Sequence, residues 1–226
     1  MRTSYIFCPS GILNHDKINK IIIPGIKNDG DIYIAADSGI KTAKKLNIKP
    51  DVLIGDFDSF DLSDLSELIE LKLEDNNIKI IKYPEEKDDT DLMLAVKYSL
   101  ELNYKNIIII GGLDGRTDHT IANIFYLKYI KNHGASGYIT NGYNKISYLK
   151  NSSVKIYKNH KYISVIPVSS EINGVILRNF KYSLENATVK SEEPFTVCNE
   201  ISKDSEHGEI IISDGEALIC ECDDFI

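Results

Sequence analysis

The first 140 residues of this 226-residue chain alternate between short apolar runs and amphipathic segments of helix length. Several runs consist of β-branched residues without polar alternation, which is typical of strands covered on both faces. We expect strands at Ser4–Cys8, Asp31–Ala36, Val52–Ile54, Ile78–Tyr83, Asn106–Ile110 and Gly137–Thr140. We expect helices at Gly39–Leu46, Leu62–Leu73, Asp91–Leu102 and His119–Asn132. This alternation predicts an α/β domain with a mostly parallel sheet and right-handed crossovers.

After about Asn141 the pattern changes to short β-rich segments separated by turn residues, with no helix signal. The predicted strands are Ile146–Leu149, Val154–Tyr157, Tyr162–Pro167, Gly174–Leu177, Ala187–Lys190, Phe195–Asn199, Glu209–Ser213 and Ala217–Glu221. Short strands at this spacing favour an antiparallel sandwich or barrel. We therefore expect an α/β domain over residues 1–141 and a β-rich domain over residues 142–226.

Composition excludes several classes of function. The chain carries 26 Lys and Arg against 34 Asp and Glu, a net charge of −8, and it has no basic cluster. A nucleic-acid partner is not expected, because such proteins need clustered positive charge. No apolar run approaches the roughly 20 residues of a membrane helix, and no signal peptide is evident. We expect a cytoplasmic protein whose four cysteines are reduced.

Acidic residues follow four of the predicted strands at the point where each strand ends. They are Asp37, then Asp56 and Asp58, then Asp88, Asp89 and Asp91, and then Asp114 and Asp118. If the strands are parallel, all four groups lie at one edge of the sheet, where open α/β sheets bind ligands. The positions of the carboxylates therefore indicate a candidate site.

Each acidic group has a simpler explanation, because Asp and Gly are ordinary turn formers. Asp89 or Thr90 could cap the next helix, and Asp118 could do the same further along. Two unpaired carboxylates about 4 Å apart, however, repel by about 4 kcal/mol at an effective dielectric of about 20. Several carboxylates gathered at one edge thus favour a bound cation, and hard oxygen ligands suit Mg²⁺.

The segment after the fifth predicted strand is suited to phosphate. Gly111 and Gly112 allow a ligand to approach the backbone closely, and Asp118 stands at the start of a helix whose N-terminus attracts anions. Arg116 can hold two phosphate oxygens with its planar fork, and Lys87 could add a second positive charge. His119 either contacts a substrate or is a polar residue at the helix start.

Taken together, four segments resemble the thiamine pyrophosphokinase family. They are Ala36-Asp37-Ser38-Gly39, Pro50-Asp51 leading to Gly55-Asp56-Phe57-Asp58-Ser59, Lys87-Asp88-Asp89-Thr90-Asp91, and Gly111-Gly112-Leu113-Asp114-Gly115-Arg116-Thr117-Asp118-His119 continuing to Ala122-Asn123. Their order and spacing match the family, as does the change to a β-rich second half. The resemblance covers nearly the whole chain. The resemblance implies a Rossmann-like first domain that binds ATP and Mg²⁺. It also implies a β-sandwich that binds thiamine and forms a homodimer, with active sites between subunits.

The same resemblance implies a transferase that moves a diphosphate from ATP to the hydroxyl of thiamine, releasing AMP. It assigns Asp56, Asp58 and Asp91 as magnesium ligands, and it assigns these three with Arg116 and Asp118 as the catalytic residues. The nucleotide would contact Asp37, Lys87, Thr90, Arg116, Asp118 and His119. Thiamine would contact Asp91 and, in the second domain, Asn199, which follows Cys198 where the family usually has Ser.

Two other functions are compatible with the same residues. The acceptor could be a different alcohol, such as a hydroxymethyl-pterin, because the carboxylate edge handles only ATP and metal. The chain could also be a sensor of thiamine or nucleotide without catalysis, although all four motifs are complete. The general base stays open, and Asp91 is one candidate.

Overall fold

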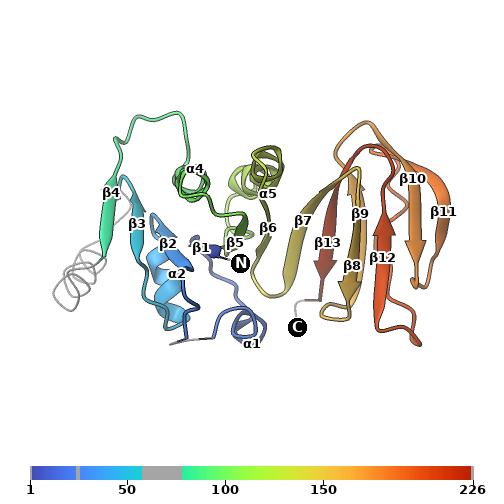
Figure 1. Cartoon of the computed structure of the whole chain (residues 1–226), viewed down its shortest axis with the longest axis horizontal. Coiled ribbons are helices and arrows are strands. Elements are labelled where there is room, and N and C mark those ends of the chain that lie inside the picture. The colour runs from blue at the N-terminus through green and yellow to red at the C-terminus, as the bar shows by residue number, and fades with distance from the viewer. Residues whose placement is uncertain (1, 24–25, 58–77, 225–226) are drawn as a thin grey trace. The chain divides into compact units, whose positions relative to one another are not determined.

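The computed structural model describes residues 2–23, 26–57 and 78–224. The chain divides into two compact units, Met1–Gly142 and Tyr143–Ile226, whose elements are labelled in Figure 1. Asp58 and the predicted helix Leu62–Leu73 lie outside the described residues, so both stay predictions.

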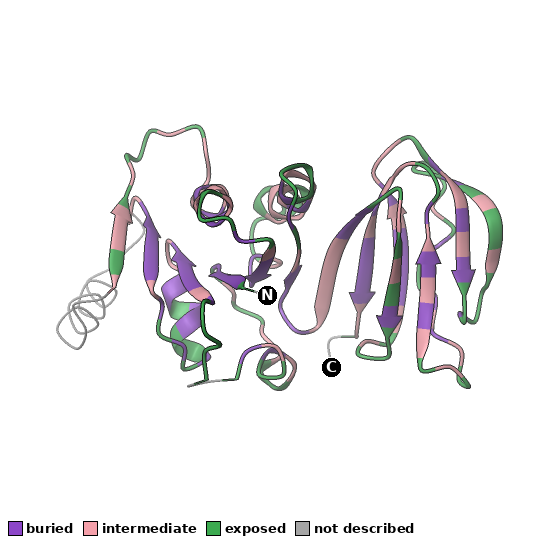
Figure 2. Cartoon of the chain, viewed as in Figure 1, coloured by how far each residue is buried: buried purple, intermediate pink, exposed green. Residues whose placement is uncertain are grey.

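Unit 1 is built on a parallel sheet in the order β4-β3-β2-β1-β5-β6. The strands are β1 (Thr3–Phe7), β2 (Ile32–Ala36), β3 (Val52–Gly55), β4 (Lys79–Lys82), β5 (Asn106–Ile110) and β6 (Ser136–Thr140). Every residue of β1 and β3 is buried, as Figure 2 shows for β3. Burial on both faces explains why β3 is a continuous apolar run and why β1 is mostly apolar.

Wherever the connection between consecutive strands of unit 1 holds a described helix, that helix provides the crossover that parallel pairing requires. The described helices are α1 (His15–Ile18), α2 (Gly39–Lys45), α4 (Asp91–Glu101) and α5 (Thr117–Asn132). The buried face of α4 includes Leu92, Ala95, Val96 and Ser99, which recur at helical spacing. The sequence patterns do not predict the short α1, which Asn14 caps by accepting a hydrogen bond from the backbone of Lys17. None of the described helices is both long and apolar enough to cross a membrane.

The register of the strands brings their carboxyl ends to a common level. Phe7 at the end of β1 is paired with Ala35 on β2 and with Ile110 on β5. Ile54 on β3 is paired with Ala36 on β2. The connection after β1 runs to β2 on one side, and the connection after the neighbouring strand β5 runs to β6 on the opposite side. A crevice at such a reversal is the usual ligand site of open α/β sheets.

Unit 2 contains only β-strands among its described residues. They are β7 (Asn144–Lys150), β8 (Ser153–Tyr157), β9 (Tyr162–Pro167), β10 (Glu171–Arg178), β11 (Leu184–Lys190), β12 (His207–Ile211) and β13 (Glu216–Cys222). Antiparallel pairing links β7, β13 and β9 in one sheet and β11, β10, β12 and β8 in another. Side chains of both sheets, such as Val165, Val175, Ile210 and Ile219, form one buried core. The predicted combination of a mostly parallel α/β sheet with an antiparallel sandwich is confirmed.

One predicted strand is wrong. Phe195–Asn199 does not form a regular strand, although Asn199 makes an isolated bridge with Ile163. Cys198 has a φ of +59°, which lies outside the extended region and interrupts a ladder. Pro194 precedes the segment and lacks a backbone N–H. Residues 195–199 therefore lie beside β9 and form an isolated bridge with it, but they do not add a regular strand to its sheet.

Candidate active site

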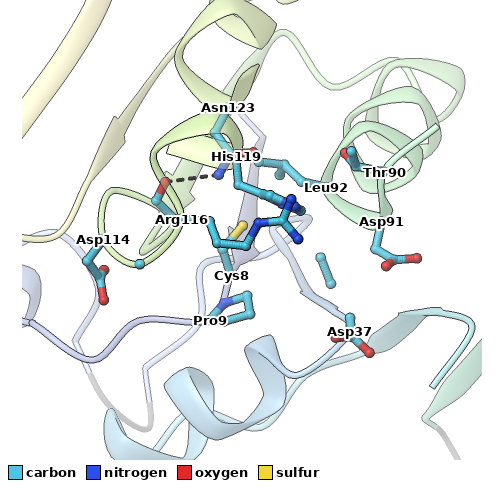
Figure 3. A pocket seen from close by; sticks show the side chains of 13 residues that line it. Cys8, Pro9, Asp37, Thr90, Asp91, Leu92, Asp114, Arg116, His119 and Asn123 are labelled. Atoms are coloured by element: carbon cyan, nitrogen blue, oxygen red, sulfur yellow. Dashed lines mark hydrogen bonds between the residues drawn. The ribbon is translucent and has the colours of Figure 1, made fainter. Parts of the chain in front are cut away.

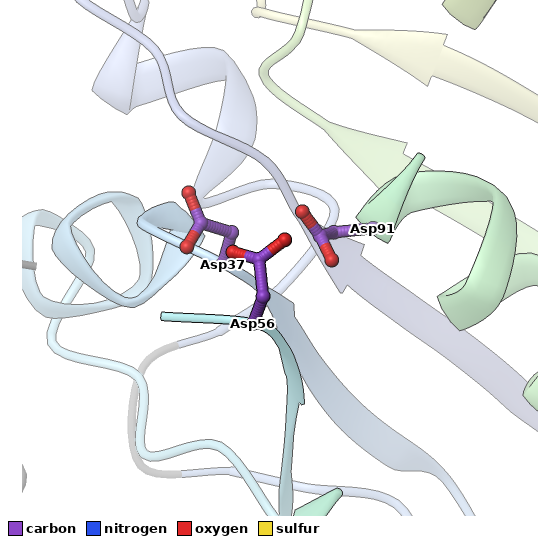
Figure 4. A group of neighbouring side chains, drawn as sticks. All are labelled: Asp37, Asp56 and Asp91. Carbon is purple, nitrogen blue, oxygen red and sulfur yellow. The ribbon is translucent and has the colours of Figure 1, made fainter. Parts of the chain in front are cut away.

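Three carboxylates meet beyond the carboxyl ends of β2 and β3. Asp37 follows β2, Asp56 follows β3, and Asp91 is the first residue of α4. Each offers one oxygen atom to a group in which all three oxygens lie within 4.8 Å of one another. Figure 4 shows the three side chains converging from separate segments of unit 1. Parallel pairing of β2 with β3 places Asp37 beside Asp56, and the connection to α4 adds Asp91.

Lys87 neutralises part of this negative charge. Its ammonium group forms ion pairs with Asp56 and with Asp91 Oδ1, the latter at 3.0 Å. Burial lowers the pKa of Lys87, but the hydrogen bonds to Asp56 and Asp91 outweigh burial and raise the pKa overall. The positively charged ammonium group of Lys87 is therefore stabilised between the carboxylates of Asp56 and Asp91.

Burial raises the pKa of Asp91, the ion pair with Lys87 opposes that change, and the charges of Asp56 and Asp37 add to the rise. Several acidic groups this close are stable only when a positive charge compensates their repulsion. The donor set consists of carboxylate oxygens, which are the ligands that Mg²⁺ prefers. The residues present thus fit a magnesium ion.

The predicted magnesium ligands are Asp56, Asp58 and Asp91. The structure brings Asp56 and Asp91 together, and Asp58 lies outside the described residues. Asp37, which the resemblance assigns to the nucleotide, lies in the same group. Its position directly after a strand is the signal available in the sequence, because Asp56 has the same position on the neighbouring strand.

A pocket of about 380 Å³ lies next to the carboxylates. Asp37 and Asp91 contribute to its wall, and Cys8 and Pro9 after β1 also line it. Figure 3 shows Asp37 and Asp91 on one side of the pocket and Asp114 on the other. The remaining wall residues come from the end of β2, the start of α4, the segment between β5 and α5, and the first turns of α5: Ala36, Thr90, Leu92, Gly112, Gly115, Arg116, His119 and Asn123.

The segment from Gly111 to Gly115, called the glycine segment, follows β5 and lies close to the residues after β1 and to α5. Gly112 has a φ of +71°, and a Cβ atom there would stand 3.0 Å from Asn123 Nδ2 and 3.3 Å from Cys8 Cβ. Only glycine adopts this conformation readily in so little space. Asn123 Nδ2 donates a hydrogen bond of 2.9 Å to the carbonyl oxygen of Gly112. The backbone of this segment is thereby held at the pocket wall.

Asp114 fastens the glycine segment to the loop after β1. Its Oδ1 accepts a hydrogen bond of 2.6 Å from Ser10 Oγ, and its Oδ2 accepts one of 2.6 Å from the backbone of Gly11. The sequence patterns place Asp114 among the acidic residues at the strand ends but assign it no specific role. No local pattern points to this contact, because more than 100 residues separate Asp114 from its partners.

Arg116 and Asp118 form a two-bond ion pair at the rim of the pocket. Arg116 Nη2 lies 2.6 Å from Asp118 Oδ2, and Arg116 Nε lies 3.2 Å from Oδ1. The hydrogen bonds from Arg116 and from the backbone of His119 lower the pKa of Asp118 to about 2. The side chains are 74% and 64% exposed, so both can still reach a ligand.

Two capping alternatives are decided by the structure. Thr90, not Asp89, caps α4, because Thr90 Oγ1 accepts a hydrogen bond of 3.2 Å from the backbone of Met93. Asp118 does not cap α5: Arg116 is at that position and Asp118 belongs to the first turn. A carboxylate in the first turn still interacts favourably with the positive end of the helix dipole.

Asn199 belongs to unit 2 and is only 5% exposed. Its Nδ2 donates a hydrogen bond of 2.7 Å to the carbonyl oxygen of Tyr182, and its Oδ1 accepts from the backbone of Tyr182 at 3.1 Å. Oδ1 also accepts from the backbone of Glu200 at 2.9 Å. The amide therefore fixes the backbone of Tyr182, whose side chain is exposed.

Comparison with known families gives two consecutive matches. The family model described as "Thiamin pyrophosphokinase, catalytic domain" matches residues 24–139. The one described as "Thiamin pyrophosphokinase, vitamin B1 binding domain" matches residues 151–215. The carboxylates and nearly all of the pocket fall within the first match, and Asn199 falls within the second.

Individual proteins are similar over most of the chain. The thiamine pyrophosphokinase of Bacillus subtilis strain 168 is 31% identical over 187 residues, which cover 80% of this chain and 85% of that protein. The crystal structure of thiamine pyrophosphokinase from Bacillus subtilis has the same fold, with a TM-score of 0.85, 23% identity and full coverage of both chains. Thiamin pyrophosphokinase from Candida albicans gives a TM-score of 0.75 at 15% identity, over 98% of this chain and 89% of that one.

Proposed function

The chain belongs to the thiamin pyrophosphokinase family, and we propose that it transfers a diphosphate group from ATP to the hydroxyl of thiamine, giving thiamine diphosphate and AMP. The observation that carries the proposal is the convergence of Asp37, Asp56 and Asp91 beside the pocket at the edge of the parallel sheet. This arrangement supports the proposal, because carboxylates that could hold a metal lie next to a cavity whose other wall is suited to phosphate.

Asp56 and Asp91 would hold Mg²⁺, together with Asp58 and with Asp37 beside them. The bound ion would neutralise phosphate oxygens and align the attacking and leaving oxygens. Lys87 now forms ion pairs with Asp56 and Asp91, so its ammonium group would move to the phosphates when the metal binds. Asp91 would also face the hydroxyl of thiamine; its position in the pocket wall and in the carboxylate group supports this role.

Arg116 would stabilise the charge that develops on the transferred group. Asp118 engages Nε and one donor of Nη2, which leaves the Nη1 edge of the guanidinium for phosphate oxygens. The N-terminus of the 16-residue helix α5 adds its dipole at the same wall. Thr90 and His119 also line the pocket and would contact the nucleotide. Positioning and electrostatics of this kind supply most of the rate in phosphoryl transfer.

Unit 2 would supply the thiamine-binding part of the site. Asn199 would act beside thiamine by fixing the loop that carries Tyr182. We propose a homodimer in which each active site combines the carboxylates of one subunit with the Asn199 region of the other. We further propose a cytoplasmic enzyme of thiamine diphosphate biosynthesis, which uses ATP as co-substrate.

The direct test is the formation of AMP and thiamine diphosphate by the purified protein with ATP, thiamine and Mg²⁺. We expect both products in equal amounts, and we expect both to disappear when EDTA removes the metal. Release of ADP instead of AMP, or undiminished turnover in EDTA, would contradict the proposed reaction or the proposed metal.

The alternative acceptor, a hydroxymethyl-pterin, is not favoured, because the second half of the chain matches a vitamin B1 binding domain. The same assay with a pterin alcohol in place of thiamine provides the comparison. AMP release with the pterin alone would replace thiamine as the acceptor while leaving the ATP and metal site in place.

A further inference from the structure

Helix α5 fastens two separate parts of the pocket wall through side chains three residues apart. Asn123 donates to the carbonyl oxygen of Gly112 in the segment after β5. Tyr126 forms a hydrogen bond of 2.9 Å between its hydroxyl and Thr90 Oγ1 at the start of α4. Residues three apart on a helix lie on the same face. One face of α5 therefore contacts both the glycine segment and the residue that precedes Asp91.

The contact with Thr90 bears directly on the carboxylate group. Thr90 has extended backbone angles, φ −70° and ψ 158°, and its hydroxyl oxygen accepts from the backbone N–H of Met93. This hydrogen bond fixes the first turn of α4, in which Asp91 is the first residue. The Thr90 hydroxyl thus helps to fix the position of the Asp91 backbone at the start of α4.

Asp91 needs such restraint because it is held close to like charges. Its carboxylate lies within 4.8 Å of those of Asp37 and Asp56. Repulsion among the three groups favours any movement of the α4 start away from the other two. Lys87 opposes this movement through its ion pair with Asp91, but the same ion pair would be given up when a metal ion takes its place. A tether outside the carboxylate group keeps its effect in both states.

We propose that Tyr126 is a positioning residue for the metal site: its hydroxyl holds Thr90, and through Thr90 it holds Asp91 in place to bind a divalent cation. The inference rests on the proposed function, because it assumes that the carboxylates bind metal. Tyr126 itself contacts neither the metal nor the reacting atoms. Its role is to join α5, which carries the phosphate-binding end of the pocket, to the helix that carries a metal ligand.

The test is the affinity of the full-length protein for Mn²⁺, used as a paramagnetic probe and measured by electron paramagnetic resonance without ATP or thiamine. Tyr126→Phe removes only the hydroxyl and keeps the ring. The loss of one hydrogen bond that orients a ligand should raise the Kd for Mn²⁺ by roughly 3- to 10-fold. Tyr129→Phe, on the next turn of the same helix, is the matched control, because the Tyr129 ring stacks on His133 at the C-terminal end of α5. The control should bind Mn²⁺ as the wild-type protein does.

A double-mutant comparison tests the route through Thr90. Thr90→Val removes the hydroxyl partner and keeps the shape of the side chain, so adding Tyr126→Phe to it should change the Kd no further. A lowered Tm with an unchanged Kd in Tyr126→Phe would mean a merely structural role and would overturn the inference. An undiminished effect of Tyr126→Phe in the Thr90→Val background would overturn the route through Thr90. Absence of Mn²⁺ binding by the wild-type protein would instead overturn the metal site, and the inference with it.

Discussion

Asp37, Asp56 and Asp91 illustrate how single residues acquire a function from their place in the sheet. Each is an ordinary turn or helix-start residue when read locally: Asp37 and Asp56 follow strands, and Asp91 is the first residue of a helix. Their oxygens come within 4.8 Å of one another only because β2 and β3 are parallel neighbours and α4 starts beside them. Such a group is costly without a cation, and this cost is a physical reason to assign it a metal.

Asp56→Asn should remove turnover while the protein stays folded. The change keeps the size of the side chain and removes one negative charge from the proposed metal ligands. Loss of a metal ligand should reduce kcat by at least about 100-fold, since bound metal supplies several kcal/mol of transition-state stabilisation. The measurement is AMP release at saturating substrates, with circular dichroism to verify folding.

The matched control for Asp56→Asn is Asp89→Asn. Asp89 is two residues from Asp91 but pairs with Lys97 on the outside of α4, at 2.6 Å. The Asp89→Asn protein should keep nearly wild-type activity. Normal turnover of the Asp56→Asn protein at ordinary Mg²⁺ would refute the metal assignment.

Buried thiols predict how stability depends on alkaline pH. Burial raises the pKa of Cys220 to about 12 from an ordinary value near 9. The thiol then stays protonated in the folded protein while the unfolded chain loses the proton. Its contribution to stability is complete below pH 9 and is lost as the pH rises toward 12, by about 1.4 kcal/mol per pH unit.

Cys220→Ala should therefore make the free energy of unfolding fall less steeply with pH. Urea denaturation at pH 7, 9 and 10 measures that slope. Cys198→Ala is the comparison, because Cys198 is exposed and should leave the slope as in the wild-type protein. Equal slopes for Cys220→Ala and wild type would show that Cys220 ionises as readily in the folded protein as in the unfolded one.

At the scale of elements, the pocket depends on cross-links between segments that follow different strands. Asp114 joins the segment after β5 to the loop after β1, and Asn123 joins the same segment to α5. Tyr126 joins α5 to α4. The strand register aligns the carboxyl ends of the strands, and these side chains fix the distances between the segments that follow the strands.

Asp114→Ala should weaken the binding of ATP more than it slows the chemical step. It removes the acceptor for both Ser10 Oγ and the backbone N–H of Gly11, so the loop that carries Pro9 loses two hydrogen bonds. We expect the KM for ATP to rise by roughly 5- to 20-fold, since each bond contributes about 0.5–1.5 kcal/mol. Steady-state kinetics with varied ATP measures the change.

Ser10→Ala removes only one of the two hydrogen bonds and serves as the graded control for Asp114→Ala. Its KM for ATP should lie between those of the wild type and Asp114→Ala. A KM for ATP unaffected by Asp114→Ala would mean that the loop after β1 holds its place without this contact.

At the scale of the whole molecule, the residues of the proposed site are divided between the two units. The carboxylates, the glycine segment and Arg116 belong to unit 1, and Asn199 with Tyr182 belongs to unit 2. The two family matches fall on the same two parts of the chain. Under the proposed function, a reaction between ATP and thiamine would require both units, whether from one subunit or from two.

Mixing of inactive subunits tests the proposed homodimer. If each site combines Asp56 of one subunit with Asn199 of the other, a mixed dimer of Asp56→Asn and Asn199→Ala chains has one intact site. Random exchange makes half of the dimers mixed, so about a quarter of the wild-type activity should return. The measurement is AMP release after unfolding and refolding the two variants together. If the refolded mixture shows no activity, each active site lies within a single subunit.

Local patterns in the sequence are sufficient to predict most of the elements. Short, mostly apolar runs without regular polar alternation predict β1, β2, β3 and β5, as is typical of strands covered on both faces. The apolar stripe of α4 repeats at helical spacing. The errors also have local causes: α1 is a single turn, too short for periodicity, and the positive φ of Cys198 interrupts the predicted strand Phe195–Asn199.

The sequence by itself determined the type of most of the described elements and the positions of the acidic residues at the ends of strands. Only the tertiary structure decided which of these residues meet. The grouping of Asp37 with Asp56 and Asp91, the ion pairs of Lys87, and the contact between Tyr126 and Thr90 all depend on strand order and register. Periodicity and turn chemistry act over a few residues and are legible in the sequence. Contacts between distant segments depend instead on how the whole chain buries its apolar surface.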